Sequence, residues 1–187
     1  CARLAKFITM CFDRKASFEP NTDLAILETT LVREGIRKTW INWICKKVDM
    51  ASNSDRDICI IVGGNTKVTV HGSGTGGKNM ESALAAAVQM QDEFSVKQMK
   101  VPERQMCFLS GDTDGYDGVT KMAGAVIDQD FLQKVSSSGL DMKQYLDNND
   151  SFSLFNQVNG GQNLIPTNLT GTNVMDIVIL LVQRTRM

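Results

Sequence analysis

A glycine-rich stretch at residues 72–79, Gly-Ser-Gly-Thr-Gly-Gly-Lys-Asn, constrains the fold of this chain more than any other feature. It joins a strand-like segment to a helix-like one, and its glycines allow the backbone to turn tightly. Such a loop can hold an anion, because its N–H groups are unobstructed and the following helix adds its N-terminal dipole. The same glycines can instead serve only to let segments pack closely. The loop alone leaves both interpretations open.

The stretch also differs from the known nucleotide-binding loops. Gly72 and Gly77 have the spacing of a P-loop and Lys78 follows them, but Asn79 takes the place of the hydroxyl residue. In the phosphate-binding interpretation Lys78 supplies the positive charge. The expected phosphate contacts are then Gly74, Gly76, Gly77 and Asn79.

An aspartate-rich loop follows the next strand-like segment. Asp112, Asp114 and Asp117 lie within six residues of one another, among glycines. Hard oxygen ligands at alternating positions suit Mg²⁺ or Ca²⁺, so Asp112 and Asp114 are candidate metal ligands. No glutamate closes the loop as in an EF-hand, and a solvated turn is the alternative. Three carboxylates with no lysine or arginine nearby in the sequence repel one another, which favours a functional loop.

Hydrophobic periodicity predicts an α/β layered domain, with a mixed β-sheet flanked by helices and preceded by a helical segment. The apolar run 58–62 predicts a strand covered on both faces, and the turn after it predicts a hairpin with residues 66–71. Further strands are expected at 105–109, 123–127 and 174–182. Helices are expected at 2–13, 24–34, 40–48, 80–91, 130–135, 141–146 and 151–158. We therefore divide the chain into a helical segment at 1–50 and an α/β domain at 57–187.

The composition argues against several classes of protein. The 20 basic and 21 acidic residues nearly balance, which argues against a nucleic-acid partner. No apolar run has the length of a bilayer crossing, so no membrane partner is expected. The five cysteines and single histidine are scattered, which argues against zinc and favours a reducing compartment. We expect the cytoplasm, with the mitochondrion left open because the chain does not begin with methionine.

A series of short motifs resembles, in order, those of the glycerate 2-kinase family, and specifically of its C-terminal MOFRL domain. The resemblance spans residues 58–182. Its motifs are GGNTKVTV (63–70), GSGTGGKNME (72–81), ALA (83–85), TDGYDG (113–118), AGA (123–125), NDS (149–151) and TGTNVMD (170–176). An ordered run of matches is more specific than any single loop. The Gly171-Thr172-Asn173 stretch by itself predicts only a turn, and the resemblance makes it a third candidate site loop.

The resemblance implies a two-domain enzyme that uses ATP and Mg²⁺ to phosphorylate the 2-hydroxyl of D-glycerate or a related hydroxy acid. The reaction would take place in a cleft between this domain and an N-terminal Rossmann-like domain of the same parent protein. Residues 1–50 would be the end of the region that joins the two. With half of the cleft absent, the fragment alone is expected to be inactive, because phosphoryl transfer depends on positioned donor and acceptor oxygens.

By the same resemblance, Lys78, Asp114 and Asp117 are the candidate catalytic residues. The glycine loop and Lys78 would contact a phosphoryl group, and the aspartate loop would hold metal through Asp112 and Asp114 or orient the glycerate hydroxyl. The candidates for binding substrate or phosphate are Gly74, Gly76, Gly77, Asn79, Thr113, Gly171, Thr172 and Asn173.

This chain departs from the family pattern inside the same loops. Asn65 stands where the family usually has glutamate, Lys78 where it has arginine, and Met80 where it has glutamine. Lysine keeps the charge but loses the bidentate geometry that suits phosphate or carboxylate. A second hypothesis is therefore a phosphate- or metabolite-binding domain that has lost kinase activity. A third is a calcium-binding structural module built on the aspartate loop.

Overall fold

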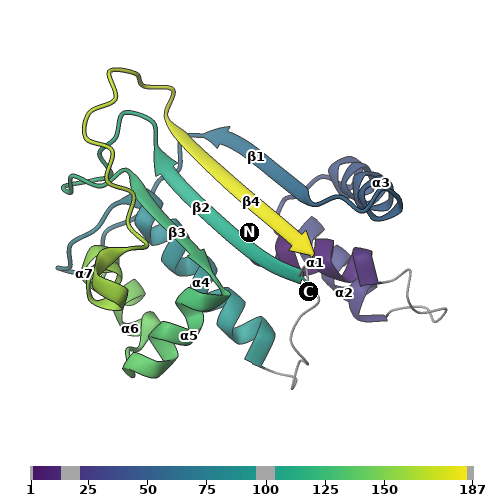
Figure 1. Cartoon of the computed structure of the whole chain (residues 1–187), viewed down its shortest axis with the longest axis horizontal. Helices are drawn as coiled ribbons and strands as arrows, with labels where there is room; N and C mark the ends of the chain where they lie inside the picture. Colours follow the sequence, from purple (N-terminus) through teal and green to yellow (C-terminus); the bar gives the residue numbers. More distant parts are fainter. Residues whose placement is uncertain (1, 14–21, 96–103, 185–187) are drawn as a thin grey trace.

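A computed structural model describes residues 2–13, 22–95 and 104–184 of the chain (Figure 1). The helices in these ranges are α1 (Ala2–Asp13), α2 (Thr22–Arg33), α3 (Lys38–Asn53), α4 (Lys78–Ser95), α5 (Gln129–Ser138), α6 (Met142–Asp147) and α7 (Ser151–Gln157). The strands are β1 (Ile58–Gly64), β2 (Arg104–Asp112), β3 (Gly124–Asp128) and β4 (Asp176–Arg184). The α/β class expected from hydrophobic periodicity is confirmed.

The strands form a single sheet in the order β1-β4-β2-β3, and each of its ladders is antiparallel. The expected mixed sheet and the hairpin with residues 66–71 are therefore wrong. Gly63 and Gly64 do not turn the chain; they extend β1, opposite Ile177 and Asp176 of β4. Residues 66–71 form no strand, because the neighbour of β1 comes from the far end of the chain.

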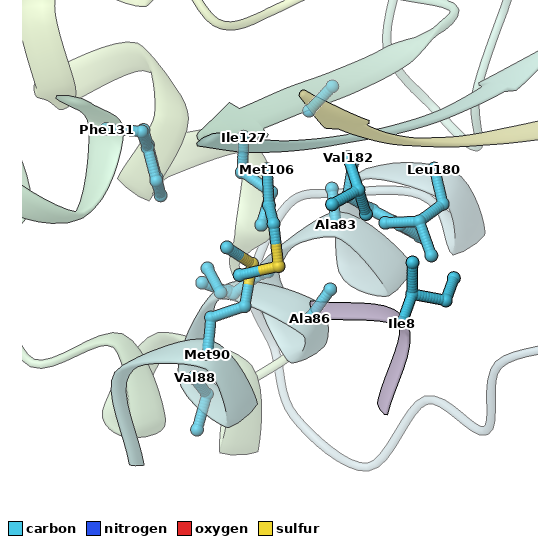
Figure 2. Close-up of a cluster of buried hydrophobic side chains, with 14 of the residues drawn as sticks. Ile8, Ala83, Ala86, Val88, Met90, Met106, Ile127, Phe131, Leu180 and Val182 are labelled. Carbon is cyan, nitrogen blue, oxygen red and sulfur yellow. The ribbon is translucent and has the colours of Figure 1, made fainter. Parts of the chain in front are cut away.

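The hydrophobic core lies between one face of the sheet and helices α1 and α4. Leu180 and Val182 of β4 point towards Ile8 of α1 and Ala83 of α4 (Figure 2). The buried side chains of the N-terminal helices and of the α/β part belong to one continuous cluster. The predicted boundary between the helical segment and the α/β domain lies near the end of α3. The hydrophobic core is continuous across this boundary.

The opposite face of the sheet has no helix over it among the described residues (Figure 1). Ile61 of β1 is 67% exposed, and Cys59 is exposed as well. The prediction that β1 is covered on both faces is wrong, because β1 is an edge strand and only one face of the sheet is packed.

The apolar face of α3 also differs from the predicted one. The helical spacing of Trp40, Ile44 and Val48 predicts that they share one buried face, but Trp40 is 55% exposed, and Ile41 is buried with Ile44 and Val48 instead. None of the helices in the described part of the chain combines the length and the hydropathy that a membrane crossing requires.

The three short helices after β3 lie at their predicted positions, with ends shifted by up to three residues, and α5 has a cap at each end. The Asp128 side chain accepts a hydrogen bond from the N–H of Phe131 at 2.8 Å and so caps the start of α5. Gly139 ends this helix in the left-handed conformation, at φ +68°. These caps direct the chain from β3 towards α7, whose preceding loop meets the glycine-rich stretch.

Candidate functional site

Three loops meet at one end of the sheet because of the strand register. Asp112 is the last residue of β2, and it lies opposite Asp176, the first residue of β4. Asp176 in turn lies opposite Gly64, the last residue of β1. The aspartate loop, the segment before β4 and the segment after β1 therefore leave the sheet side by side, next to the N-terminus of α4.

Asp176 is the centre of this cluster. It is 1% exposed, and both of its carboxylate oxygens accept hydrogen bonds. Oδ1 accepts from Asn79 Nδ2 at 2.8 Å, and Oδ2 accepts from the Thr66 N–H at 2.6 Å and the Thr66 hydroxyl at 2.8 Å. Burial alone would raise the pKa of Asp176, but the donors from Asn79, Thr66 and Lys78 outweigh it and lower this pKa. Asp176 is thus an ionised carboxylate at neutral pH.

Lys78 bridges two of the aspartates. Its Nζ lies 3.0 Å from Asp176 Oδ1 and 3.2 Å from Asp112 Oδ2, and it donates to Asn65 Oδ1 at 3.4 Å. Partial burial opposes the charged form, but Asp176 and Asp112 outweigh it and raise the pKa of Lys78. Although no lysine or arginine is close to the aspartates in sequence, α4 brings the ammonium of Lys78 to Asp112 and Asp176. The calcium-binding module loses its main support for the same reason.

Asp117 caps the N-terminus of α4. It is fully buried, and its carboxylate accepts from the N–H groups of Asn79, at 3.0 and 3.1 Å, and of Met80, at 2.8 Å. Burial raises the pKa of Asp117, and the negative charge of Asp112 adds to this effect. A protein carboxylate thus takes the place at the helix N-terminus where the phosphate-binding interpretation puts an anion. This geometry gives Asp117 a structural role.

The side chain of Asn79 links the two buried aspartates to β2. Its Oδ1 accepts from the Ser110 hydroxyl at 2.6 Å while its Nδ2 donates to Asp176. Ser110 and Asp176 are both buried, and sequence reasoning did not single out either of them. Each is a polar residue where the apolar part of a strand meets a candidate loop: Ser110 near the end of β2, and Asp176 at the start of β4. That pattern was the signal available in the sequence.

The glycine-rich stretch is packed against the loop at residues 148–150. The N–H groups of residues 72–75 donate to that loop: those of Gly72 and Ser73 to the side chains of Asn149 and Asn148, that of Gly74 to the Asn148 carbonyl, and that of Thr75 to the Asp150 side chain. These four donors are therefore already engaged.

Glycine is required at these positions because neighbouring segments lie too close to the backbone to leave room for a Cβ. A Cβ on Gly76 would lie 2.3 Å from Ser151 Oγ, and a Cβ on Gly77 would lie 2.3 Å from Asp117 Cγ. Gly74 is equally crowded, with Asp150 Cβ at 2.3 Å. The geometry favours the packing interpretation of the stretch. Phosphate binding by Gly74, Gly76, Gly77 and Asn79 stays a prediction.

The aspartate loop and the loop before β4 are joined by hydrogen bonds. Thr113 donates from its hydroxyl to the Met175 carbonyl at 2.7 Å, and Asn173 Nδ2 donates to Asp114 Oδ2 at 3.2 Å. The structure therefore brings three of the predicted residues, Thr113, Asp114 and Asn173, together. Gly171 and Thr172 lie beyond them on the exposed part of the loop.

The cluster carries excess negative charge. The carboxylates of Asp112 and Asp176 contact the ammonium of Lys78, and Asp114 lies next to Asp112, to which its N–H donates at 3.3 Å. In the described ranges, no group of three or more acidic, histidine or cysteine side chains is placed to hold a metal ion. The site can present one ammonium and carboxylate oxygens to a ligand, but its own charge does not favour a free polyanion.

The residues of these loops lie within a region that matches a known protein family. A family model described as the MOFRL family matches residues 58–176. A glycerate kinase from Rattus norvegicus is 44% identical over 123 residues, which cover 66% of this chain and 22% of that protein. A D-glycerate 2-kinase from Thermotoga maritima is 38% identical over 123 residues, which cover 66% of this chain and 26% of that protein.

Two solved structures have a similar fold. The crystal structure of a glycerate kinase from Thermotoga maritima has a TM-score of 0.54 and 36% sequence identity, over 66% of this chain and 27% of that one. A protein from Pyrococcus horikoshii has a TM-score of 0.55 and 31% identity, over 68% of this chain and 26% of that one. The chain spans about a quarter of the length of these relatives. Because the family model covers more than half of it and includes the site loops, the chain belongs to the MOFRL family.

Proposed function

We propose that this chain is the C-terminal part of an ATP-dependent D-glycerate 2-kinase, and that it has no activity without the rest of that enzyme. Membership of the MOFRL family and relatives named glycerate kinase support the proposal. The observation that carries it is the position of Lys78, which is held by Asp112 and Asp176 where the family's loops meet. An ammonium at that place is suited to contact a phosphoryl or carboxylate oxygen.

In this proposal Lys78 binds an anionic oxygen while its two aspartates hold the side chain in place. The Lys78 side chain retains 23% exposure, so one side of the ammonium can face a ligand. Asp114 is positioned by Asn173 and by the N–H of Tyr116, at 3.2 and 3.0 Å. Its carboxylate would orient the glycerate hydroxyl and accept the proton of that group as the new bond forms.

The donor chemistry of the aspartate loop fits Mg²⁺. This ion takes hard oxygen ligands and needs only one or two protein carboxylates when nucleotide phosphates complete its shell. Asp112 and Asp114 are the residues that would hold it, and Asp114 is the less encumbered because Lys78 binds Asp112. Bound with ATP, the ion would neutralise charge on the phosphates.

The charge of the cluster explains why the fragment is proposed to be inactive. Both ATP and glycerate are anions, and the described cluster has more carboxylates than ammonium groups. Further cationic or N–H donors must come from elsewhere in the parent, since the glycine loop donates most of its N–H groups to the protein. We assign those donors to an N-terminal Rossmann-like domain that completes the cleft.

The test is ADP release by the full-length parent with D-glycerate, ATP and Mg²⁺. We expect turnover by the parent, none by residues 1–187 alone, and a loss of at least about 100-fold in kcat/KM for Lys78→Met. Lys134→Met, on the exposed side of α5, is the matched control and should retain activity. A silent parent, with related hydroxy acids also silent, would refute the kinase proposal.

A second candidate function is a phosphate- or metabolite-binding domain without kinase activity. The departures from the family pattern at Asn65 and Lys78 favour it, because both side chains belong to the ion-pair cluster. Calorimetry on the full-length parent distinguishes the two. Nucleotide or phosphate binding without any ADP release would support this second function.

A further inference from the structure

Two cysteines far apart in the chain lie side by side in the N-terminal helices. Cys11 of α1 and Cys45 of α3 have their Sγ atoms 3.8 Å apart, although 34 residues separate them in sequence. A disulfide bond has an S–S length of about 2.05 Å. A combined movement of about 2 Å by the two thiols would therefore bring them to bonding distance.

We propose that this pair is a dithiol modification site, at which small disulfides such as oxidised glutathione convert the two thiols reversibly into a Cys11–Cys45 disulfide. Cys45 is half-buried and Cys11 is 8% exposed, so Cys45 is the thiol that a solvent oxidant reaches first. The helices that carry the two residues pack directly against each other. The bond would therefore tie α1 to α3 within the existing fold.

The reaction proceeds by two thiol–disulfide exchanges. The Cys45 thiolate attacks one sulfur of oxidised glutathione, forming a mixed disulfide and releasing a glutathione thiolate. Cys11 then loses its proton and attacks the Cys45 sulfur, which releases the second glutathione. The two protein thiols are oxidised to one disulfide, one oxidised glutathione is reduced to two thiols, and the two protons end on the released thiols.

Two other cysteines provide an internal contrast. Cys59 of β1 and Cys107 of β2 both lie opposite Leu181 of β4, on either side of it. They are thus two strand spacings apart, about 9.5 Å, which exceeds the Cα separation that a disulfide spans. Cys59 is exposed and should form a mixed disulfide with glutathione without closing an internal bond.

The experiment uses the whole chain of residues 1–187, equilibrated with reduced and oxidised glutathione in varied ratios. After alkylation of remaining thiols and tryptic digestion without reductant, mass spectrometry locates the disulfides. We expect a cross-linked pair of the peptides 7–14 and 39–46, which disappears on treatment with dithiothreitol. The oxidised chain should also have a Tm about 5 °C or more above that of the reduced chain, since the cross-link restricts the unfolded state.

The control variant is Cys59→Ser, which should keep the cross-link, and Cys45→Ser should lose both it and the Tm difference. If Cys45→Ser fails to fold, Cys45→Ala replaces it, and the peptide map of the wild-type chain does not depend on either variant. The proposal is overturned if Cys11 and Cys45 are both alkylated under conditions that fully glutathionylate Cys59. A glutathione adduct that persists on Cys45 beside an alkylated Cys11 overturns it as well.

Discussion

The ammonium of Lys78 lies 3.0 Å from the carboxylate of Asp176, a side chain that is almost completely buried at the start of β4. This ion pair connects the glycine-rich stretch to the last strand of the sheet. Asp112 pairs with the same ammonium. One lysine therefore partly compensates the negative charge of two aspartates, at the place where three loops meet. Stability and the proposed chemistry therefore depend on the same few polar groups.

Asp176→Asn is expected to destabilise the chain at neutral pH by about 2–4 kcal/mol, because Lys78 and Thr66 lose a charged acceptor. The pKa of Asp176 is lowered in the folded chain, so its contribution is present above the unfolded value of 3.8 and is lost as pH falls through the folded value. Urea unfolding of both chains as a function of pH measures this. The difference between them should narrow below pH 3.8; a difference that is constant with pH would contradict the assignment.

Asn79→Leu is expected to cost about 3 kcal/mol or more, because the buried groups of Ser110 and Asp176 each lose a hydrogen-bond partner. Ser82→Ala is the matched control in the same helix. Its hydroxyl bonds only to the Lys78 carbonyl one turn earlier, so its loss should cost under about 1 kcal/mol. Chemical denaturation compares the two, and similar values would show that the buried network contributes little.

Gly77→Ala should prevent or severely weaken folding in the absence of any ligand. The added Cβ would meet the Asp117 carboxylate, whose atoms lie 2.3 to 2.5 Å from its position. Gly64→Ala is the control, since nothing lies within 4 Å of a Cβ there. Thermal unfolding of the ligand-free chain distinguishes the packing role of the loop from a phosphate-binding role. A Gly77→Ala chain as stable as the Gly64→Ala chain would refute the packing role.

Lys78→Arg and Lys78→Met separate charge from geometry in the full-length parent. Arginine keeps the charge and offers a bidentate fork, so we expect it to retain more kcat/KM than methionine, by at least about 10-fold. The measurement is steady-state ADP release at saturating ATP. Equal losses in the two variants would mean that Lys78 acts through its exact position between Asp112 and Asp176 and not through charge.

Much of the local structure could be predicted from the sequence. The positions of α1, α2 and α5 and those of β2, β3 and β4 follow from residue spacing, because helix and strand periods act over a few neighbours. The partner of β1 could not be predicted in this way. It comes from the far end of the chain, and a nearby glycine turn offered a plausible alternative.

The exposure of β1 and of Trp40 has a similar explanation. An apolar run shows that a segment can be buried but not whether a helix covers each of its faces. Only the strand order, with β1 at the edge, shows that Ile61 remains exposed. The predicted location in the cytoplasm and the boundary near residue 50 stay predictions.

The sequence by itself determined the α/β class, the family resemblance and the loops that hold the candidate site, because these depend on local periodicity and on ordered motifs. Only the tertiary structure decided which residues of those loops meet. It paired Lys78 with Asp112 and Asp176 and turned Asp117 into the cap of α4. It also closed the glycine loop against residues 148–150. The reason is physical: charge pairing and close packing depend on contacts between residues distant in sequence, and strand register together with the packing of α4 and of the loops sets them.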